Sequence, residues 1–342
     1  MYKIAVFNHK GGVSKTTTVY HLGWMLTNKG KRVLLVDTDS QCNLTLTVIG
    51  DDNYEKFNEE NPKTNIKSAL SPAFDSRPEL IQAVDAVQVK DNNSLFLIPG
   101  SFEITEYEVQ LGVSFQLSHS FSTMKNLPGA FNYLIEKTAQ KHNIDYVLLD
   151  LNPSLSAINQ DLVLISDFFI VPTSPDYFSK MALKSIARIL PQWERWAKQA
   201  RQLFSDATYT LPNKTPKFLG YTVNDYTLKS GEPSKAFQII INELNVVINN
   251  DIVPSLEKVE MTLKKELYNG FDFCLAKIPN FHSLQPRYQQ YGLPIFELTN
   301  DQIGSTGPVL EQQAANREKF KSIYSDFADK VIHLTLNANK QF

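Results

Sequence analysis

The chain has 342 residues, of which 42% are hydrophobic and 20% charged, and its formal net charge is −2. This composition is ordinary for a soluble globular protein, and no apolar run approaches the ~20 residues that span a bilayer. No signal-peptide pattern precedes the first apolar run, so we expect a cytoplasmic protein without a membrane partner. Because the chain is not basic overall, any nucleic-acid binding has to come from a local patch.

Strands are indicated by short apolar runs without polar alternation, the pattern of strands buried on both faces of a parallel sheet. These runs cover residues 3–7, 32–36, 95–98, 146–149, 168–171, 218–223 and 273–278. Helical spacing of apolar residues follows Thr16, with Gly30 as the expected stop. A second helix is expected over residues 179–190, where Pro191 interrupts it, and a third over residues 312–334.

The alternation of strands and helices predicts a doubly wound α/β fold, with a mostly parallel sheet flanked by helices. We expect residues 1–342 to form a single domain. Three stretches are longer than a simple strand-to-helix connection requires, and we interpret them as insertions. They cover about residues 51–93, 192–217 and 242–269.

A glycine-containing loop, Asn-His-Lys-Gly-Gly-Val-Ser-Lys-Thr-Thr at residues 8–17, lies between the first predicted strand and the first predicted helix. A loop in this position aims backbone N–H groups and the positive helix end at phosphates. Lys15 is expected to reach the β- and γ-phosphates, and the Thr16 hydroxyl to coordinate Mg²⁺. The loop therefore predicts a P-loop ATPase that binds ATP and Mg²⁺. The expected nucleotide contacts are Gly11, Gly12, Val13, Ser14, Lys15, Thr16 and Thr17.

Residues 10–17 resemble the deviant Walker A box of the ParA/MinD partition ATPases, in which a signature lysine precedes two glycines. Lys10 matches that lysine. The resemblance implies a homodimer that sandwiches two ATP molecules, with each Lys10 crossing to the phosphates of the other subunit. The loop departs from the general pattern at His9, where a glycine is usual. It departs from the commonest family form at Ser14, a change that bears on the rate of hydrolysis.

Two further predicted strands end in aspartates, which places carboxylates at the ligand crevice of a doubly wound sheet. Residues 36–44 are similar to the family's Asp-x-Asp-Pro-Gln-x-Asn motif, with Ser40 in place of the proline. The resemblance implies that Asp39 orients or activates the attacking water and that Asp37 lies near the Mg²⁺ shell. Residues 146–150 form a Walker B strand whose Asp150 holds Mg²⁺. Asn152 replaces the first proline of the family's Asp-x-Pro-Pro.

Later segments match the family in order and spacing. Asn224 resembles the family's adenine-side asparagine, since a carboxamide both donates to and accepts from a purine edge. A buried or turn-capping asparagine is the alternative interpretation. Pro279 and Asn280 lie in a segment that resembles the one bordering the base. The predicted catalytic residues are thus Lys10, Lys15 and Asp39, and the predicted metal ligands are Thr16, Asp37 and Asp150.

The resemblance implies a cycle in which the ATP-bound dimer binds DNA without sequence preference. A ParB-like or adaptor protein then stimulates ATP hydrolysis that is slow without it, and the cycle positions or segregates a plasmid, chromosome region or protein cargo. Lysines and arginines on one face neutralise DNA phosphates. The candidates are Lys184 and Arg188, joined by Arg195 and Lys198 if the helix continues past Pro191, and Arg317, Lys319, Lys321 and Lys330. A solvated helix face explains these charges equally well.

Three alternatives stay open. The first is a metabolic enzyme or reductase on the same scaffold. The nitrogenase iron protein is one such reductase and bridges an iron–sulfur cluster with cysteines, but Cys42 and Cys274 do not match those positions. A MinD-like membrane-positioning ATPase carries a basic amphipathic C-terminal helix, whereas residues 337–342 are polar. The third alternative is a scaffold that binds ATP without hydrolysing it.

Overall fold

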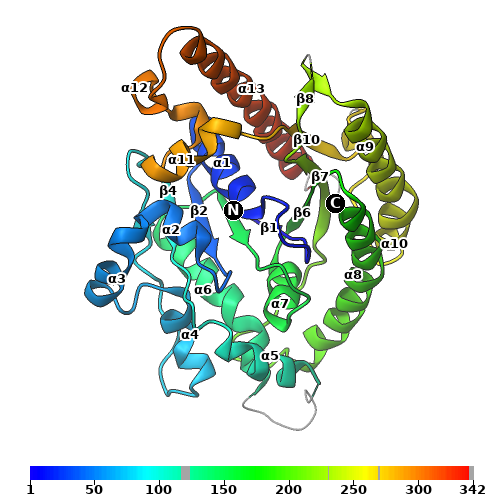
Figure 1. The fold of residues 1–342 in the computed structure, drawn as a ribbon. Helices are drawn as coiled ribbons and strands as arrows, with labels where there is room; N and C mark the ends of the chain where they lie inside the picture. The colour runs from blue at the N-terminus through cyan, green and yellow to red at the C-terminus, as the bar shows by residue number, and fades with distance from the viewer. Residues whose placement is uncertain (117–123, 230, 269, 339–342) are drawn as a thin grey trace.

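A computed structural model of the chain describes residues 1–116, 124–229, 231–268 and 270–338 (Figure 1). An eight-stranded sheet lies at its centre, in the order β10-β7-β6-β1-β5-β2-β4-β3. All neighbouring strands are parallel except β3, which runs antiparallel to β4. The predicted doubly wound, mostly parallel α/β fold is therefore confirmed.

Each of the seven predicted apolar runs is a strand, and its ends differ from the prediction by no more than two residues. The strands of the sheet are β1 Tyr2–Val6, β2 Val33–Asp37, β3 Val87–Gln88, β4 Leu95–Ile98, β5 Tyr146–Asp150, β6 Phe168–Thr173, β7 Lys217–Asn224 and β10 Cys274–Ile278. The central strands β1, β2 and β5 are almost wholly buried, because helices cover both faces. A separate two-stranded hairpin pairs β8 Leu228–Lys229 with β9 Glu232–Pro233.

Two layers of helices enclose the sheet, as Figure 1 shows. Helix α1 contacts α13 on one face, whereas α7 contacts both α6 and α8 on the other. The helices are α1 Lys15–Asn28, α2 Asn43–Ile49, α3 Asp51–Glu60, α4 Ile66–Phe74, α5 Glu106–Gln116, α6 Leu127–Lys141, α7 Ala157–Ile165, α8 Tyr177–Leu203, α9 Lys235–Val247, α10 Val253–Glu257, α11 Gln285–Tyr291, α12 Asn300–Ile303 and α13 Gly307–Ala338. Helix α1 ends just before Gly30, whose φ of 75° fits the predicted stop.

The expectation that Pro191 interrupts its helix is wrong, because α8 continues to Leu203. A proline inside a helix costs about 3 kcal/mol, through a lost hydrogen bond and a clash with the preceding turn. Here the apolar face of α8 is buried on both sides of the proline, including Leu190 and Trp193, and the helix packs against α7, α9 and α10. Burial of this face outweighs the local penalty.

The three stretches that we interpret as insertions contain regular structure. Residues 51–93 hold α3, α4 and β3, and residues 192–203 continue α8. Residues 242–269 hold the end of α9, a turn of π-helix at Ile248–Ile252, and α10. That these stretches are additions to a common core stays a prediction, as does the single domain, although β1 and β10 from opposite ends of the chain join one sheet.

Candidate nucleotide site

The loop between β1 and α1 lies at the carboxyl edge of the sheet, where β2 and β5 also end. Its last residue before the helix, Ser14, has φ 60° and ψ 39°, the left-handed conformation. Glycine adopts this conformation freely, whereas a side chain makes it costly. The commonest family form has glycine at this position, and the backbone geometry supplies the physical reason. The Ser14 carbonyl in turn accepts hydrogen bonds from the N–H and hydroxyl of Thr18.

A cavity of about 930 Å³ opens over this loop. Its lining includes the loop residues Gly11, Gly12, Val13, Ser14, Lys15, Thr16 and Thr17. Asp39 and Pro153, from the loops that follow β2 and β5, line it from the side of the aspartate motifs. The structure therefore brings together every loop residue predicted to contact nucleotide with the carboxylate predicted to act on water.

Lys15 is buried, and its ammonium donates to the backbone carbonyl of Lys10 across 3.2 Å. Burial lowers the pKa of Lys15, while the nearby carboxylates of Asp150 and Asp39 favour its charged form. An ammonium in such a place is poorly solvated, and a phosphate oxygen supplies a stronger partner than a carbonyl. Lys15 is therefore suited to bind a phosphate chain.

Asp150, the last residue of β5, is the first of the predicted metal ligands to consider. Both carboxylate oxygens of Asp150 are buried and accept no hydrogen bond of normal geometry among the described residues. Burial and the charge of Asp37 raise the pKa of Asp150, although the neighbouring Thr16 hydroxyl and Lys15 ammonium favour its ionised form. An unpartnered buried carboxylate beside a hydroxyl is the oxygen donor set that Mg²⁺ takes. Asp150 and Thr16 therefore fit the predicted metal site.

Asp37 is engaged within the protein. Its Oδ2 accepts from the backbone N–H of Thr45 at 2.8 Å and from the Thr45 hydroxyl at 2.6 Å, and its Oδ1 accepts from the N–H of Asp39 at 3.2 Å. Burial raises the pKa of Asp37 to about 6. These bonds hold α2 against the end of β2. A place near the Mg²⁺ shell stays a prediction for Asp37.

A smaller cavity of about 270 Å³ adjoins the phosphate cavity and shares Ser14, Thr17 and Gln285 with it. Asn224, Pro279 and Asn280, the residues predicted to border the base, all line it. The Asn224 amide donates to the Val13 carbonyl at 2.9 Å and to the Thr18 hydroxyl at 3.3 Å, so it braces the P-loop.

The Oδ1 atom of Asn224 is buried without a hydrogen-bond partner among the described residues. A buried acceptor without a donor is costly, and the exocyclic amine of a purine supplies such a donor. Asn224 therefore combines the two interpretations drawn from the sequence. It is a buried structural asparagine, and it also keeps one acceptor for a ligand.

Sequence reasoning missed α11 as part of the site. Tyr288 and Gln285 line the phosphate cavity, and the Tyr288 hydroxyl lies 3.4 Å from that of Thr17. The segment Gln-Pro-Arg-Tyr-Gln-Gln-Tyr matches no motif for nucleotide binding, and only the fold brings it beside the P-loop. No signal in these residues alone points to the site.

Lys10 differs from residues 11–17 of its motif, because it is absent from the described lining of the phosphate cavity. Its ammonium instead forms an ion pair with the Asp176 carboxylate at the start of α8. The Lys10 ammonium is thus held by Asp176, while its charge also contributes to lowering the pKa of the neighbouring Lys15.

The basic candidates on α8 form a continuous stripe, because the helix does not break at Pro191. Lys184, Arg188, Arg195 and Lys198 are all exposed and recur at helical spacing. The acidic residue of this stretch, Glu194, is buried and pairs with Arg201 at 2.8 Å. The outer face of α8 therefore carries positive charge from Lys184 to Lys198, a distance of about 21 Å along the helix.

The C-terminal basic candidates lie in a different setting on α13. The Arg317 guanidinium donates to the Leu298 carbonyl at 2.7 Å, and the Lys330 ammonium donates to the Leu275 carbonyl at 2.9 Å. Lys319 and Lys321 are exposed, but α13 also exposes Glu318, Asp326 and Asp329. The structure separates the two basic sets and leaves α8 with the uniform charge.

Among the residues that the structure describes, no helix combines the length and apolar character needed to cross a bilayer. The two thiols lie far apart in the fold, since Cys42 follows β2 and Cys274 begins the edge strand β10. They are not brought together as a pair.

The fold and the site define a P-loop nucleotide-binding protein with a deviant Walker A loop. A family model described as an AAA domain matches residues 1–203. The chain is 28% identical over 242 residues to an uncharacterized protein of Methanocaldococcus jannaschii, covering 70% of this chain and 78% of that protein. It is 29% identical over 187 residues to the sporulation initiation inhibitor protein Soj of Bacillus subtilis, covering 55% of this chain and 62% of Soj.

Solved structures show the same fold. Protein DIP2308 of Corynebacterium diphtheriae has a TM-score of 0.67 at 20% identity and covers 85% of this chain and 97% of its own. The ATP complex of a Cyanothece McdA variant has a TM-score of 0.54 at 18% identity, with 94% and 97% covered. The ParA of pNOB8 bound to nonspecific DNA has a TM-score of 0.56 at 16% identity, with 98% and 99% covered. This chain belongs to the ParA/MinD family of P-loop partition ATPases.

Proposed function

We propose that this chain is an ATP-dependent switch that dimerises around ATP, binds DNA without sequence preference in that state, and positions or segregates a cargo. The observation that carries the proposal is the placement of Lys10. The other residues of its motif line the phosphate cavity of their own chain, whereas Lys10 lies outside it. A lysine so placed has no phosphate to neutralise within its own subunit, but a facing subunit supplies one.

Within one subunit, Lys15 and the N-terminus of α1 bind the phosphate chain, and Asn224 orients the base through its free acceptor. Thr16 and Asp150 hold Mg²⁺, which when bound neutralises phosphate charge and aligns the phosphates. Asp39 lies at the mouth of the cavity with one oxygen accepting from the Gln41 N–H at 3.0 Å. We propose that its second oxygen orients the attacking water, and we assign Asp39 the catalytic role in ATP hydrolysis on that basis.

The stripe on α8 is the DNA surface that we propose. A chain of net charge −2 needs a local concentration of positive charge to hold a polyanion, and α8 supplies it with Lys184, Arg188, Arg195 and Lys198. Lys319 and Lys321 are the secondary candidates, while Arg317 is engaged with the protein's own backbone. The pNOB8 ParA bound to nonspecific DNA shares the fold, which supports DNA binding in general but does not identify the surface. DNA binding of this kind associates the protein with the nucleoid.

A ParB-like or adaptor protein completes the proposal by stimulating a hydrolysis that is slow in its absence. The curated relative Soj is matched over 62% of its length, so partner and cargo belong to the proposal alone. Exposed Tyr177, Phe178 and Met181 at the start of α8 lie beside the Lys10–Asp176 pair, where a second subunit is expected to dock.

The experiment that tests the switch is binding to random-sequence duplex DNA with ATP and with ADP across a salt series. We expect binding with ATP alone, and an affinity that falls steeply with salt because counterions are released. Replacing Lys184 and Arg188 by glutamate is expected to abolish it, whereas Lys63→Glu with Lys90→Glu, two exposed lysines far along the chain from α8, serves as the charge-matched control. Equal binding with both nucleotides, or none with either, contradicts the proposal.

A further inference from the structure

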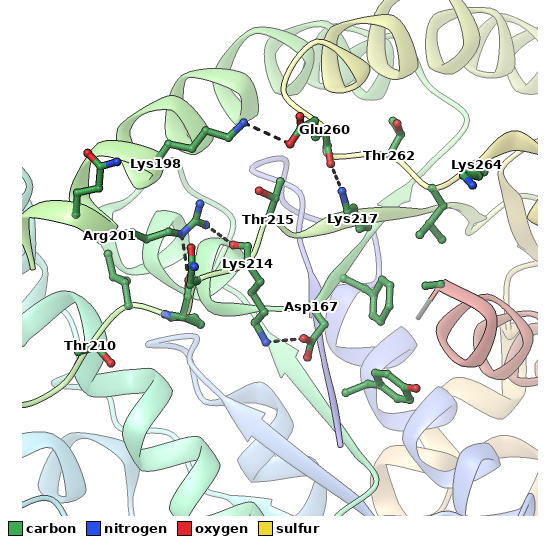
Figure 2. A pocket seen from close by; sticks show the side chains of 18 of the residues that line it. Asp167, Lys198, Arg201, Thr210, Lys214, Thr215, Lys217, Glu260, Thr262 and Lys264 are labelled. Atoms are coloured by element: carbon green, nitrogen blue, oxygen red, sulfur yellow. Dashed lines mark hydrogen bonds and ion pairs between the residues drawn. The ribbon is translucent and has the colours of Figure 1, made fainter. Parts of the chain in front are cut away.

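A second, larger cavity lies at the amino edge of the sheet, opposite the edge that carries the P-loop. Its volume is about 1430 Å³. The first residues of β1, β6 and β7 form its floor, and the end of α8, residues 210–215 and residues 260–264 surround it, as Figure 2 shows. Among the described residues that line it, none belongs to the P-loop or to the aspartate motifs.

The cavity is strongly basic although the whole chain has a net charge of −2. Its basic lining residues are Lys198, Arg201, Lys214, Lys217 and Lys264. The acidic lining residues are Asp167 and Glu260. A hollow lined by one sign of charge concentrates counterions and attracts ligands of the opposite sign.

Two of the five cations are already satisfied by the protein. The Arg201 guanidinium donates to both oxygens of the buried Glu194, at 2.8 and 3.3 Å, and to two backbone carbonyls. Lys214 forms an ion pair with Asp167, which Figure 2 marks with a dashed line. These pairs belong to the wall of the cavity. Its remaining positive charge is carried by Lys198, Lys217 and Lys264.

Glu260 is the acidic residue nearest to Lys198 and Lys217, and no ion pair of Lys264 is found among the described residues. The Lys198 ammonium lies 3.6 Å from a Glu260 oxygen, a long ion pair, while Lys217 donates to the Glu260 backbone carbonyl. Lys217 is half-buried, and this burial lowers its pKa, although Glu260 favours the charged form. A half-buried ammonium that contacts only a carbonyl gains from an anionic partner.

The groups available in the cavity favour phosphate over carboxylate. The flat fork of an arginine can bind a carboxylate or a phosphate through two bonds, but Arg201 is already committed to Glu194, which leaves the lysines. Lysines act as point charges toward phosphate, and the hydroxyls of Thr210 and Thr262 line the same space. Lys198 and Lys264 lie at the exposed rim of the cavity, and Lys217 lies deeper, at the start of β7. Leu211 and Leu263 supply apolar surface for an organic group.

We propose that this cavity binds a small phosphate ester with several negative charges, at a site separate from the P-loop. The bound phosphates contact Lys198, Lys217 and Lys264. This site goes beyond the proposed switch. Its ligand binding can be tested without ATP-dependent dimerisation.

Calorimetric titration with inorganic tripolyphosphate tests the site in the full chain carrying Lys15→Ala, without nucleotide or magnesium, so that binding at the P-loop is suppressed. We expect saturable binding that weakens at least about tenfold, or 1.4 kcal/mol, when Lys198→Gln and Lys264→Gln are added. Both lysines are exposed, so these changes do not threaten folding. Lys217→Gln, checked by thermal unfolding, is expected to have a similar effect.

Lys63→Gln with Lys90→Gln removes the same charge elsewhere on the exposed surface and is expected to leave the titration unchanged. Citrate, a polycarboxylate of similar charge, is expected to bind at least about tenfold more weakly than tripolyphosphate. The proposal is overturned if tripolyphosphate does not bind, or if the cavity variants and the control bind it equally. Citrate binding of equal strength overturns the phosphate assignment. If tripolyphosphate does not bind, and Lys198→Gln with Lys264→Gln in the chain with Lys15 intact abolishes ATP-dependent binding of duplex DNA, the proposal is replaced by an extended DNA surface.

Discussion

The Lys10 ammonium lies 2.7 Å from Oδ2 of Asp176, so the signature lysine of the P-loop is tied to the first turn of α8. The same carboxylate caps that helix, because its Oδ1 accepts from the Ser179 N–H at 2.7 Å. Burial favours the neutral form of Asp176, but the ion pair and the cap outweigh it and lower the pKa of this carboxyl. In the proposed switch, Lys10 has to leave Asp176 before it reaches a partner's phosphates.

Asp176→Asn is therefore expected to promote ATP-dependent dimerisation. Asparagine caps a helix about as well as aspartate, so the substitution removes the charge and keeps the cap. The pair is partly exposed, and such pairs contribute at most about 1 kcal/mol. A homodimer opens two of them, so the dimer is expected to form at up to about thirtyfold lower concentration. Sedimentation velocity with ATP measures this shift. Ser179→Ala, which leaves the ion pair in place, is the control. If the Asp176→Asn dimer is unchanged or weaker, the Lys10–Asp176 ion pair does not oppose dimerisation.

Lys10→Ala is expected to leave ATP binding intact and to abolish the ATP-dependent dimer. Lys15→Ala is its matched comparison in the same loop, and it is expected to weaken ATP binding by about a hundredfold or more, since a charge-assisted bond to phosphate is lost. Nucleotide titration and light scattering separate the two effects. Normal ATP affinity in Lys15→Ala refutes the P-loop assignment. An intact dimer in Lys10→Ala refutes the proposal that Lys10 reaches the phosphates of the other subunit.

Asp39→Ala is expected to trap the ATP-bound dimer by slowing hydrolysis. Asp39 reaches the phosphate cavity and is not needed to hold α2, a task that Asp37 performs through Thr45. Loss of a group that positions water costs about 10²- to 10⁴-fold in rate. Phosphate release and dimer lifetime measured together test this role. Turnover at the level of the unmodified chain moves the catalytic function to another residue.

Ser14→Gly is expected to stabilise the protein. Ser14 stands at φ 60°, where a residue with a side chain pays about 1–2 kcal/mol that glycine does not. The greater freedom of glycine in the unfolded chain offsets part of this gain, so we expect a rise in Tm of about 1–3 °C. Gly12→Ala is the opposite control, since Gly12 has φ 70° and open space around it, and strain alone lowers its Tm. A fall in Tm for Ser14→Gly shows that the serine side chain stabilises the loop.

Much of the site follows from local sequence, because its chemistry is carried by short segments between a strand and the next element. The loop at residues 10–17, Asp39 and Asp150 lie where the order of apolar runs predicts, since parallel strands end at one edge of the sheet. The strands themselves are recognisable in the sequence because a strand buried on both faces of a parallel sheet reads as an uninterrupted apolar run.

Contacts between distant segments depend on the tertiary structure. Lys10 and Asp176 are 166 positions apart, and Asn224 and Val13 are 211 apart, so neither pairing has a local signal. Each depends on the strand order that sets β6 beside β1 and β7 beside β6. The helical path through Pro191 was likewise decided by packing, since the local chemistry of proline favours a break and burial of the apolar face of α8 overrides it.

The sequence by itself thus determined the class of fold, the phosphate loop and the aspartate motifs, because hydrophobic period and short-range chemistry are written within a few residues. Only the tertiary structure decided where Lys10 points, that α8 carries one unbroken basic face, and that a basic cavity opens at the far edge of the sheet. Those properties come from side chains of remote segments meeting in space, which no single segment encodes.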